Sequence, residues 1–387
     1  MHASEVHRGV ARLAAGFAAD RHDRQRRREL DPADFEALAA AGFLLSGVPV
    51  ASGGLFEDIA RSTRPTAEMV RALARGDSSV ALVASMHPAV LSFWMASPQA
   101  PESCRVGWAE QRDRLATLAR DGAWFGTITS EPGSGGDLAA TRAIARRGPD
   151  GGWALSGQKH FGSGSGVTSF MLTAARPEGE AEPDWFYLDV RGVPWDGSSG
   201  MTLTAPWDGH GMTATQSHGM LFEEFPAQRV AWPGNWRGIS GAAGPFVGVL
   251  FTAVVVGIVE EAMATAAAQL AKRSDSLGPY ERVEWVRAEQ EAWLLRQAYE
   301  GMLRAVETEA APLRSVLLGK TACGGLAEEC LRRITRILGG GTFARHSPFG
   351  FWFEDVRALG FLRPPWPLAY DALIASAWTQ EAAYFGR

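Results

Sequence analysis

The sequence has 387 residues, of which 46% are hydrophobic and 21% charged, so it excludes intrinsic disorder as the main state and can build a large core. Its 38 lysines and arginines stand against 43 acidic residues, which gives a net charge of −5. No strong basic field exists to hold phosphate backbones, and we therefore expect no nucleic acid partner.

Targeting and redox signals are sparse. Residues 1–30 contain many arginines but no continuous apolar core, unlike a signal peptide. The three cysteines support neither a disulfide framework nor a zinc site, and we predict no metal and a cytoplasmic location.

Residues 238–259 carry no charge and approach the length of a membrane span. Pro245 interrupts this run and a charged helical pattern follows it directly, so we predict a buried helix and no membrane contact.

The first third of the chain shows helical signals. Asp31 and Pro32 mark the start of one helix, and Gly42 marks its end. Further helices are expected where apolar residues recur at spacings of three and four, over residues 63–75 and 80–94. These signals predict an N-terminal α-helical domain over residues 1–121.

The middle third has a different sequence pattern. Short runs rich in β-branched and aromatic residues alternate with glycine, proline, aspartate and serine. Strands at this spacing, without helical periods between them, predict a compact antiparallel β-barrel or sandwich over residues 122–236. The expected strands cover residues 124–129, 143–146, 153–155, 170–175, 185–190, 201–204 and 219–222.

Long helical patterns return in the last third. Such long helices with short connections predict a four-helix bundle over residues 237–387, and the whole chain is expected to be an α+β protein. The expected bundle helices cover residues 245–273, 280–309, 313–338 and 369–384.

Two motifs contain the most unusual residues of the middle third. Residues 127–137 read Thr-Ile-Thr-Ser-Glu-Pro-Gly-Ser-Gly-Gly-Asp, and residues 155–165 read Leu-Ser-Gly-Gln-Lys-His-Phe-Gly-Ser-Gly-Ser. Together with the α, β, α order, these motifs resemble those of the acyl-CoA dehydrogenase superfamily. The Gly-Gly-Gly run within residues 338–342 and Trp-Phe-Glu-Asp-Val-Arg at residues 352–357 extend the resemblance over most of the chain.

The resemblance implies a flavin, FAD being the first choice and FMN the other. A flavin ring needs a flat apolar slot with hydroxyl or N–H groups at its polar edge. Gly135 and Gly136 let the backbone approach a substrate closely, although the family usually has serine at the second position. The positions that match the family's flavin contacts are Thr127, Thr129, Ser130, Phe161 and Ser163.

The resemblance also implies cofactor contacts between subunits. Arg273 occupies the place of a family arginine that reaches the cofactor pyrophosphate of a neighbouring subunit. Arg336 stands where a glutamine is common, and Gly339 and Gly340 leave backbone N–H groups open to a phosphate. A homotetramer or homodimer is therefore expected.

The family's catalytic base is missing. Its usual glutamate position is occupied by Arg363, and the alternative position falls at about Val247. Arginine cannot accept a proton at neutral pH. Dehydrogenation of an acyl-CoA or acyl-carrier-protein thioester would therefore require a relocated carboxylate. The candidates for such a base are Glu354, Asp355 and Asp371.

A second branch of the superfamily fits better. Residues 159–164 and 211–217, with the aromatic residues 351–353, resemble dibenzothiophene-type monooxygenases, which use reduced flavin from a separate reductase to activate oxygen. Candidate catalytic residues are His87, Ser163 and Arg363. Candidate substrate residues are Gly135, Gly136, Trp94 and Trp366, and Phe161 and Trp207 could add apolar walls.

Three functions remain open at this stage. The favoured one is a flavin monooxygenase that acts on a small molecule and is served by a flavin reductase. The others are a dehydrogenase with an electron-transfer partner and a non-catalytic binding subunit. Each candidate also has a structural interpretation, because His87 equally suits a buried core position and Arg363 could pair with Asp355 or Asp371.

Overall fold

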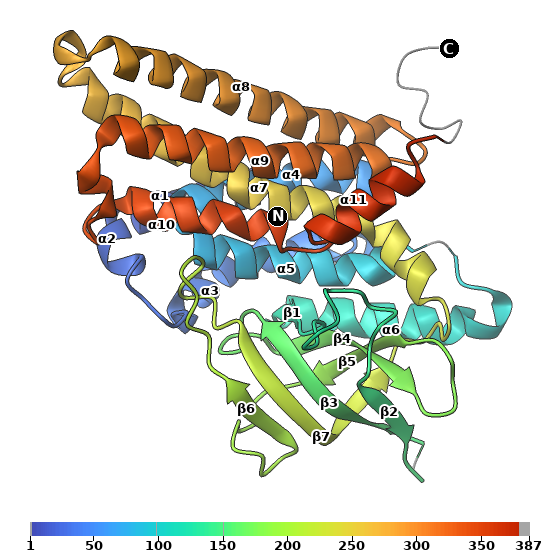
Figure 1. The fold of residues 1–387 in the computed structure, drawn as a ribbon. Helices are drawn as coiled ribbons and strands as arrows, with labels where there is room; N and C mark the ends of the chain where they lie inside the picture. The colour runs from blue at the N-terminus through green and yellow to red at the C-terminus, as the bar shows by residue number, and fades with distance from the viewer. Residues whose placement is uncertain (1, 98, 150, 379–387) are drawn as a thin grey trace.

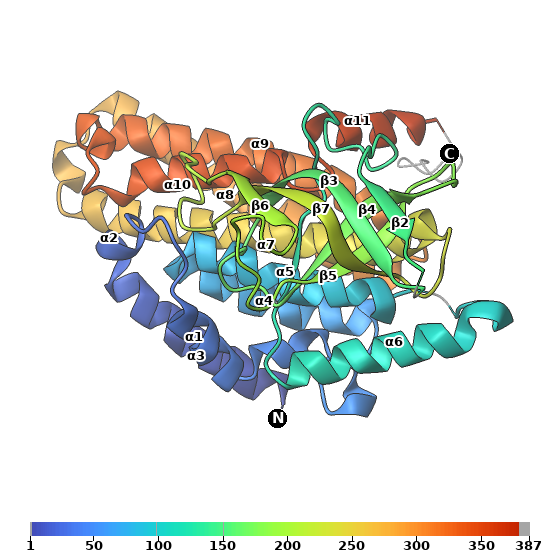
Figure 2. The ribbon, with the colours of Figure 1, turned by 90° about the horizontal axis from the view of Figure 1, so that it is seen from below.

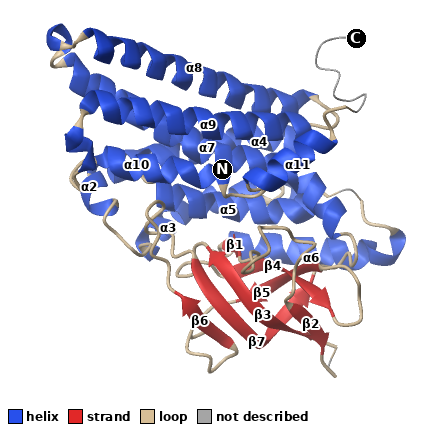
Figure 3. Ribbon diagram, viewed as in Figure 1, coloured by secondary structure: helices blue, strands red, loops and turns tan. Residues whose placement is uncertain are grey.

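A computed structural model describes residues 2–97, 99–149 and 151–378 of the chain. A thick layer of helices lies over a small β-barrel (Figures 1 and 3). The N-terminal helices are α1 (Ala3–Ala19), α2 (Arg21–Arg24), α3 (Pro32–Ala40), α4 (Ile59–Gly76), α5 (Ser78–Met95) and α6 (Glu102–Arg120). The C-terminal helices are α7 (Trp236–Ala271), α8 (Pro279–Thr308), α9 (Leu313–Leu338), α10 (Pro348–Val356) and α11 (Trp366–Ala375).

Local capping signals set the helix starts, as the sequence predicts. The Asp31 carboxylate accepts a hydrogen bond from the backbone N–H of Ala33 at the start of α3. The carboxylate of Asp77 caps α5 in the same way through the N–H of Val80. Gly42 follows α3 with φ +90°, a left-handed conformation that glycine adopts without strain.

The β-barrel closes through five strands. The ring runs β4, β2, β3, β7, β5 and back to β4, while β1 is added beside β4 and β6 beside β7. All seven predicted strands are present. Their bounds are β1 (Phe125–Thr127), β2 (Ile144–Arg147), β3 (Trp153–Gly162), β4 (Phe170–Pro177), β5 (Asp184–Asp189), β6 (Met201–Ala205) and β7 (His218–Arg229).

The expectation of a purely antiparallel sheet is wrong for two pairs. Both β1 and β2 pair with β4 in parallel. The remaining pairs are antiparallel. Alternating apolar residues define the face of a strand that is buried, but they carry no information about the direction of its partner, so periodicity could not reveal the mixed sheet.

The first and last thirds of the chain share one hydrophobic core. A single cluster of buried residues extends from Val6 in α1 to Leu359 beyond α10. Helices α4 and α5 pack on α7, which in turn packs on α8 and α9. Figure 1 shows α5 between the barrel and the long helices, and Figure 2, seen from below, shows the barrel in front of α5 and α7. Core packing thus joins the first and last thirds of the chain. The domain boundaries that the sequence predicts after residues 121 and 236 stay predictions.

The expected C-terminal bundle differs in detail. Helices α7, α8 and α9 are long, but the fourth predicted helix is the short α11, which begins at Trp366 and ends at Ala375. The part of that prediction over residues 379–384 lies outside the described residues. In place of a fourth long C-terminal helix, α4 covers α7 and α8.

Two helices are long and apolar enough to cross a membrane by length and composition. They are α5 and α7, and 83% of the most apolar window of each is buried within the described chain. The two helices pack against one another. Their apolar character is thus used in the core, as predicted for residues 238–259.

Candidate functional site

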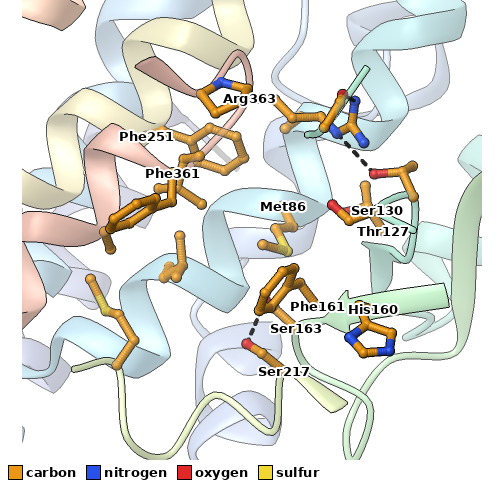
Figure 4. A pocket seen from close by; sticks show the side chains of 18 of the residues that line it. Met86, Thr127, Ser130, His160, Phe161, Ser163, Ser217, Phe251, Phe361 and Arg363 are labelled. Atoms are coloured by element: carbon orange, nitrogen blue, oxygen red, sulfur yellow. Dashed lines mark hydrogen bonds between the residues drawn. The ribbon is translucent and has the colours of Figure 1, made fainter. Parts of the chain in front are cut away.

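A cavity of about 760 Å³ lies between the helical layer and the β-barrel (Figure 4). Its walls come from α5, the loop after β1, the end of β3, the loop before β7, α7, and the segment from residue 354 to residue 365. Most of the lining is apolar or aromatic, which is typical of small-molecule sites. The largest apolar side chains include Met86, Phe93, Phe161, Trp207, Phe251 and Phe361.

Hydroxyl groups from two motifs meet on one side of this cavity. Thr127 ends β1, Thr129 and Ser130 follow it, and Ser163 follows β3. All four line the cavity, together with Ser217 from the loop before β7. The antiparallel bridge between Ser130 and His160 holds the two motifs together. The structure therefore brings together hydroxyl groups from two motifs that lie about 35 positions apart in the sequence.

Phe161 lies at the mouth of the cavity in a strained conformation. Its φ is +58° and its side chain is 57% exposed. A β-bulge between Lys159 and Gly162 produces this backbone geometry. The ring lies edge-on to Trp207, with centroids 6.2 Å apart. A bulky residue with positive φ is rare and occurs mainly at functional sites, so the fold maintains this exposed ring at an energetic cost.

A chain of hydroxyl groups runs from the cavity into the protein. The Oγ of Ser163 and the Oγ of Ser217 are 2.7 Å apart, and Ser217 is 2.7 Å from the Oγ1 of Thr215. Thr215 donates its proton to the carbonyl oxygen of Met212 at 2.8 Å. Each hydroxyl has one proton. Ser217 must then donate to Thr215, and Ser163 to Ser217, so Ser163 offers lone pairs to the cavity.

Arg363 forms part of the polar wall. Its Nε donates to Thr129 Oγ1 at 2.9 Å, the dashed line at Arg363 in Figure 4, and its Nη1 donates to the carbonyl of Gly136 at 2.9 Å. Burial lowers the pKa of Arg363 to about 10, although the nearby Asp137 opposes the shift. The guanidinium is still charged at neutral pH. No ion pair joins it to Asp355 or Asp371 in the described part of the chain, so the predicted structural pairing is absent.

A buried ion pair supports the same wall. The Nζ of Lys159 donates to Glu131 Oε1 at 2.6 Å and to the carbonyl of Ala174 at 2.5 Å. The other carboxylate oxygen of Glu131 accepts the N–H of Arg142 at 2.7 Å. Burial opposes the charged form of Glu131, but Lys159 and the backbone donors lower its pKa below the usual range. Glu131 is therefore an anchor for its loop and a poor proton acceptor.

The other candidate bases occupy three different environments. Glu354 lines the cavity and accepts a hydrogen bond from Arg357 at 2.6 Å. Asp355 lies outside the cavity and accepts bonds from Ser78 Oγ at 2.5 Å and the Met212 N–H at 2.6 Å. Burial raises the pKa of Asp355 to about 6. Asp371 is exposed on α11. Only Glu354 of the three lies where a base could act.

Two candidates from the sequence belong to the core instead. His87 is fully buried and is absent from the described cavity lining. One ring nitrogen lies 2.9 Å from the carbonyl of Leu44, and the other accepts the N–H of Phe125 at 3.4 Å. With both nitrogens used, His87 cannot also donate into the cavity. Trp94 is likewise buried, where it stacks on Trp108 and donates to a glutamine.

The remaining predicted substrate residues separate into two groups. Gly135 and Gly136 line the cavity with φ of +60° and +86°. Trp366 instead packs against Gly324 and Gly360 at the start of α11, away from the described cavity lining. The cavity therefore gives no support to Trp366 and Trp94 as substrate walls. Both were chosen as large aromatic residues, and aromatic character alone does not distinguish a core from a cavity.

The predicted phosphate contacts lie away from the cavity. Arg273 forms an ion pair with Glu281 at 2.9 Å and donates to the carbonyl of Ile337 at 2.8 Å. Arg336 ends α9, and Gly339 and Gly340 follow it. None of these residues is among the described residues that line the cavity. Their cofactor role stays a prediction that involves a neighbouring subunit.

Several cavity residues escaped the sequence analysis. The most informative are Ser217 with its hydroxyl chain, and Phe251 and Phe361 on the apolar walls. Ser217 stands within residues 211–217, a segment already singled out by resemblance, so a signal for it existed.

No group of three or more potential metal ligands occurs among the described residues.

Comparison with known proteins identifies relatives. The family model described as acyl-CoA dehydrogenase, middle domain, matches residues 126–225. Dibenzothiophene monooxygenase of Mycolicibacterium goodii is 30% identical over 246 residues, which cover 60% of this chain and 54% of the relative. The chain thus spans about half the length of that relative. Amino sugar nitrososynthase DnmZ of Streptomyces peucetius is 26% identical over 387 residues, covering 92% of this chain and 88% of the relative.

Solved structures share the same fold. KijD3 in complex with FMN and dTDP-3-amino-2,3,6-trideoxy-4-keto-3-methyl-D-glucose has a TM-score of 0.81 and 22% identity, covering 97% of this chain and 93% of the other. FMN-bound TdsC from Paenibacillus sp. A11-2 has a TM-score of 0.79 and 18% identity, covering 96% and 97%. These likenesses extend over the helical layer and the barrel together.

Proposed function

We propose that this chain is a flavin-dependent monooxygenase of the acyl-CoA dehydrogenase superfamily that acts on a small molecule. The match of residues 126–225 to the family's middle domain and the similarity to a dibenzothiophene monooxygenase and a nitrososynthase support this proposal. Reduced flavin would be supplied by a separate reductase. The observation that carries the proposal is the character of two cavity residues, Arg363 and Val247, which by resemblance stand at or near the superfamily's two base positions. Neither can accept a proton from a substrate.

The cavity fits a flavin on its own chemistry. Thr127, Ser130 and Ser163 present hydroxyl groups along one edge, and Phe161 offers an exposed aromatic face beside them. A tricyclic ring needs this combination of a flat apolar surface and a polar edge. FMN is the flavin named for the KijD3 and TdsC structures, and either FMN or FAD suits the open mouth. When bound in its reduced form, the flavin supplies the electrons that activate oxygen.

The residues of this chain would then perform three tasks. The apolar walls formed by the buried Met86 and Phe251 would exclude water from the reacting groups. Ser163 would accept a hydrogen bond from a bound ring, because its own proton is directed to Ser217. Arg363 holds positive charge beside Thr129 on the polar wall, where it would stabilise negative charge that develops during the reaction.

A second candidate function is α,β-dehydrogenation of an acyl thioester. Glu354 favours it, because this carboxylate lines the cavity. The pairing of Glu354 with Arg357 weakens it, since the carboxylate already accepts a hydrogen bond from Arg357 at 2.6 Å and would have to leave that partner to reach a substrate. A cytoplasmic location, a homotetramer or homodimer and a reductase partner also stay proposals, suggested by the sparse cysteines and by the family.

Flavin uptake is the first test. Purified protein dialysed against FAD or FMN should retain flavin and become yellow. Failure to retain either flavin would favour a binding subunit without turnover. With NADH, a general flavin reductase and oxygen, the loaded enzyme should oxygenate an indole or thiophene panel, and isotope from ¹⁸O₂ should appear in the product.

Anaerobic mixing separates the two reactions. Oxidised, flavin-loaded protein should keep its visible absorbance when mixed with a panel of acyl-CoA thioesters. Bleaching of the flavin that disappears in Glu354→Gln would instead establish the dehydrogenase. Arg357→Gln serves as the matched variant, because it leaves Glu354 present but unpaired and should increase any bleaching that depends on this carboxylate.

A further inference from the structure

Arg363 differs from the other charged groups of the cavity wall in having no ionic partner. Glu131 pairs with Lys159, and Glu354 pairs with Arg357. Among the described residues no carboxylate oxygen forms an ion pair with Arg363, whose hydrogen bonds go to Thr129 and to the backbone carbonyl of Gly136. Arg363 is partly buried, and Asp137 acts on its charge from nearby without forming an ion pair, so the guanidinium can still bind an incoming anion.

The donors of Arg363 are only partly used. A guanidinium has five N–H groups in a planar fork. Nε–H and one N–H of Nη1 are engaged by Thr129 and Gly136, which fixes the plane of the group. The Nη2 group has no hydrogen bond within the described structure. A fixed guanidinium with free donors can form paired hydrogen bonds with a carboxylate or phosphate.

The surroundings of Arg363 leave room for such a group. Gly133 and Gly135 lie in the same loop with positive φ, and no atom stands within 4 Å of where a Cβ would be. Beyond this polar end, Phe251 and Phe361 form apolar walls of the same cavity (Figure 4). The cavity therefore combines one cationic end with a wide apolar body.

From this geometry we propose that Arg363 binds an oxyanion of the substrate, so that the substrate class is a flat apolar molecule with a single carboxylate or phosphate group. The assignment of this molecule as substrate rests on the proposed function, whereas oxyanion binding at Arg363 rests on the cavity alone. The same chemistry could be presented by the phosphate of a bound flavin, and the experiment must separate these two sources.

The test uses FMN-loaded protein and a pair of probes that differ only in charge, 2-naphthoate and 2-naphthamide. Their dissociation constants are measured by isothermal titration calorimetry. Wild-type protein should bind the carboxylate at least about 10-fold more tightly than the amide, as expected for a charge-assisted hydrogen-bonded pair. Arg363→Met should lose this preference. Arg363→Lys should keep part of it, because the charge remains without the fork.

Arg142→Met provides the matched control, since Arg142 is exposed, lies near the same loop and is absent from the described cavity lining. It should retain the wild-type preference. Equal binding of the two probes by wild-type protein, or a preference that survives in folded Arg363→Met, would overturn the proposal.

The source of the oxyanion is decided by repeating the titrations without flavin. Two results together would assign Arg363 to the cofactor and refute the substrate assignment. The first is a preference for 2-naphthoate that exists only in flavin-free protein. The second is an Arg363→Met variant that binds FMN more weakly than wild type but binds riboflavin equally well. Failure of the protein to bind flavin would refute the proposed function, while the flavin-free titrations would still judge oxyanion binding at Arg363.

Discussion

The Lys159 ammonium and the Glu131 carboxylate form an ion pair of 2.6 Å inside the protein, with side-chain exposures of 0% and 3%. Lys159 lies in β3 and Glu131 in the loop after β1, so the pair ties together the two motifs that line the cavity. Burial lowers the pKa of Lys159 to about 8, and Glu131 opposes that shift. The two charges depend on one another, because neither has water to stabilise it.

Removal of one partner of this pair should therefore be severe. Lys159→Met leaves the Glu131 carboxylate buried without its cation, which should reduce the free energy of unfolding by about 3–5 kcal/mol. Urea denaturation followed by tryptophan fluorescence measures the loss. Arg191→Ala is the control, because it removes an exposed ion pair with Asp189 and should have little effect. A small loss for Lys159→Met would show that the pair does not organise the cavity wall.

His87 should influence stability through pH. Burial lowers its pKa to about 4 from the usual 6.5, although the hydrogen bond to Leu44 opposes the shift. Between these values the unfolded chain binds more protons than the folded protein, so stability falls as the pH is lowered from 6.5 to 4. Wild-type protein should lose roughly 3 kcal/mol more over this range than His87→Gln.

Thermal denaturation at several pH values measures this difference for His87. The exposed His346→Gln variant is the control and should follow the wild-type pH dependence. If His87→Gln also followed the wild-type curve, the histidine would titrate freely in the folded protein and could not be the neutral core residue that the geometry indicates.

Phe161 permits a direct measurement of backbone strain. Phe161→Ala and Phe161→Gly both remove the exposed ring, but only glycine adopts φ +58° without cost. The glycine variant should be more stable than the alanine variant by about 1–2 kcal/mol. Both should bind flavin at least about 10-fold more weakly than wild type, because they lose the same aromatic surface. Equal stability of the two variants would contradict a strained position.

The hydroxyl chain predicts an effect at a distance. Ser217→Ala removes the acceptor of the Ser163 proton, which leaves Ser163 free to donate into the cavity. The visible spectrum of bound flavin should shift, and stability should fall by roughly 1–3 kcal/mol from the broken buried bonds. Ser165→Ala is the control, because this hydroxyl bonds to the carbonyl of Gly162 in the same turn and is absent from the described cavity lining. An unchanged spectrum in Ser217→Ala would argue against a directed chain.

Sequence patterns predicted the elements well because their signals are local. Asp77 and Gly42 act within a few residues of their own helix ends, so capping could be predicted without a model of the fold. The seven strands likewise follow from alternation within each run. Whether two paired strands run parallel or antiparallel was not predictable. The parallel pairing of β2 with β4 depends on how the chain between them returns to the barrel.

The site residues show the same division. The sequence alone placed Thr129, Ser163 and Arg363 in motifs, and motif position was enough to bring them to one cavity. Only the tertiary structure separated His87, which is enclosed by the core, from Arg363, which lines the cavity and forms no ion pair among the described residues. Burial and ionic partners arise from segments hundreds of residues apart, and periodicity or spacing along one segment contains no record of them.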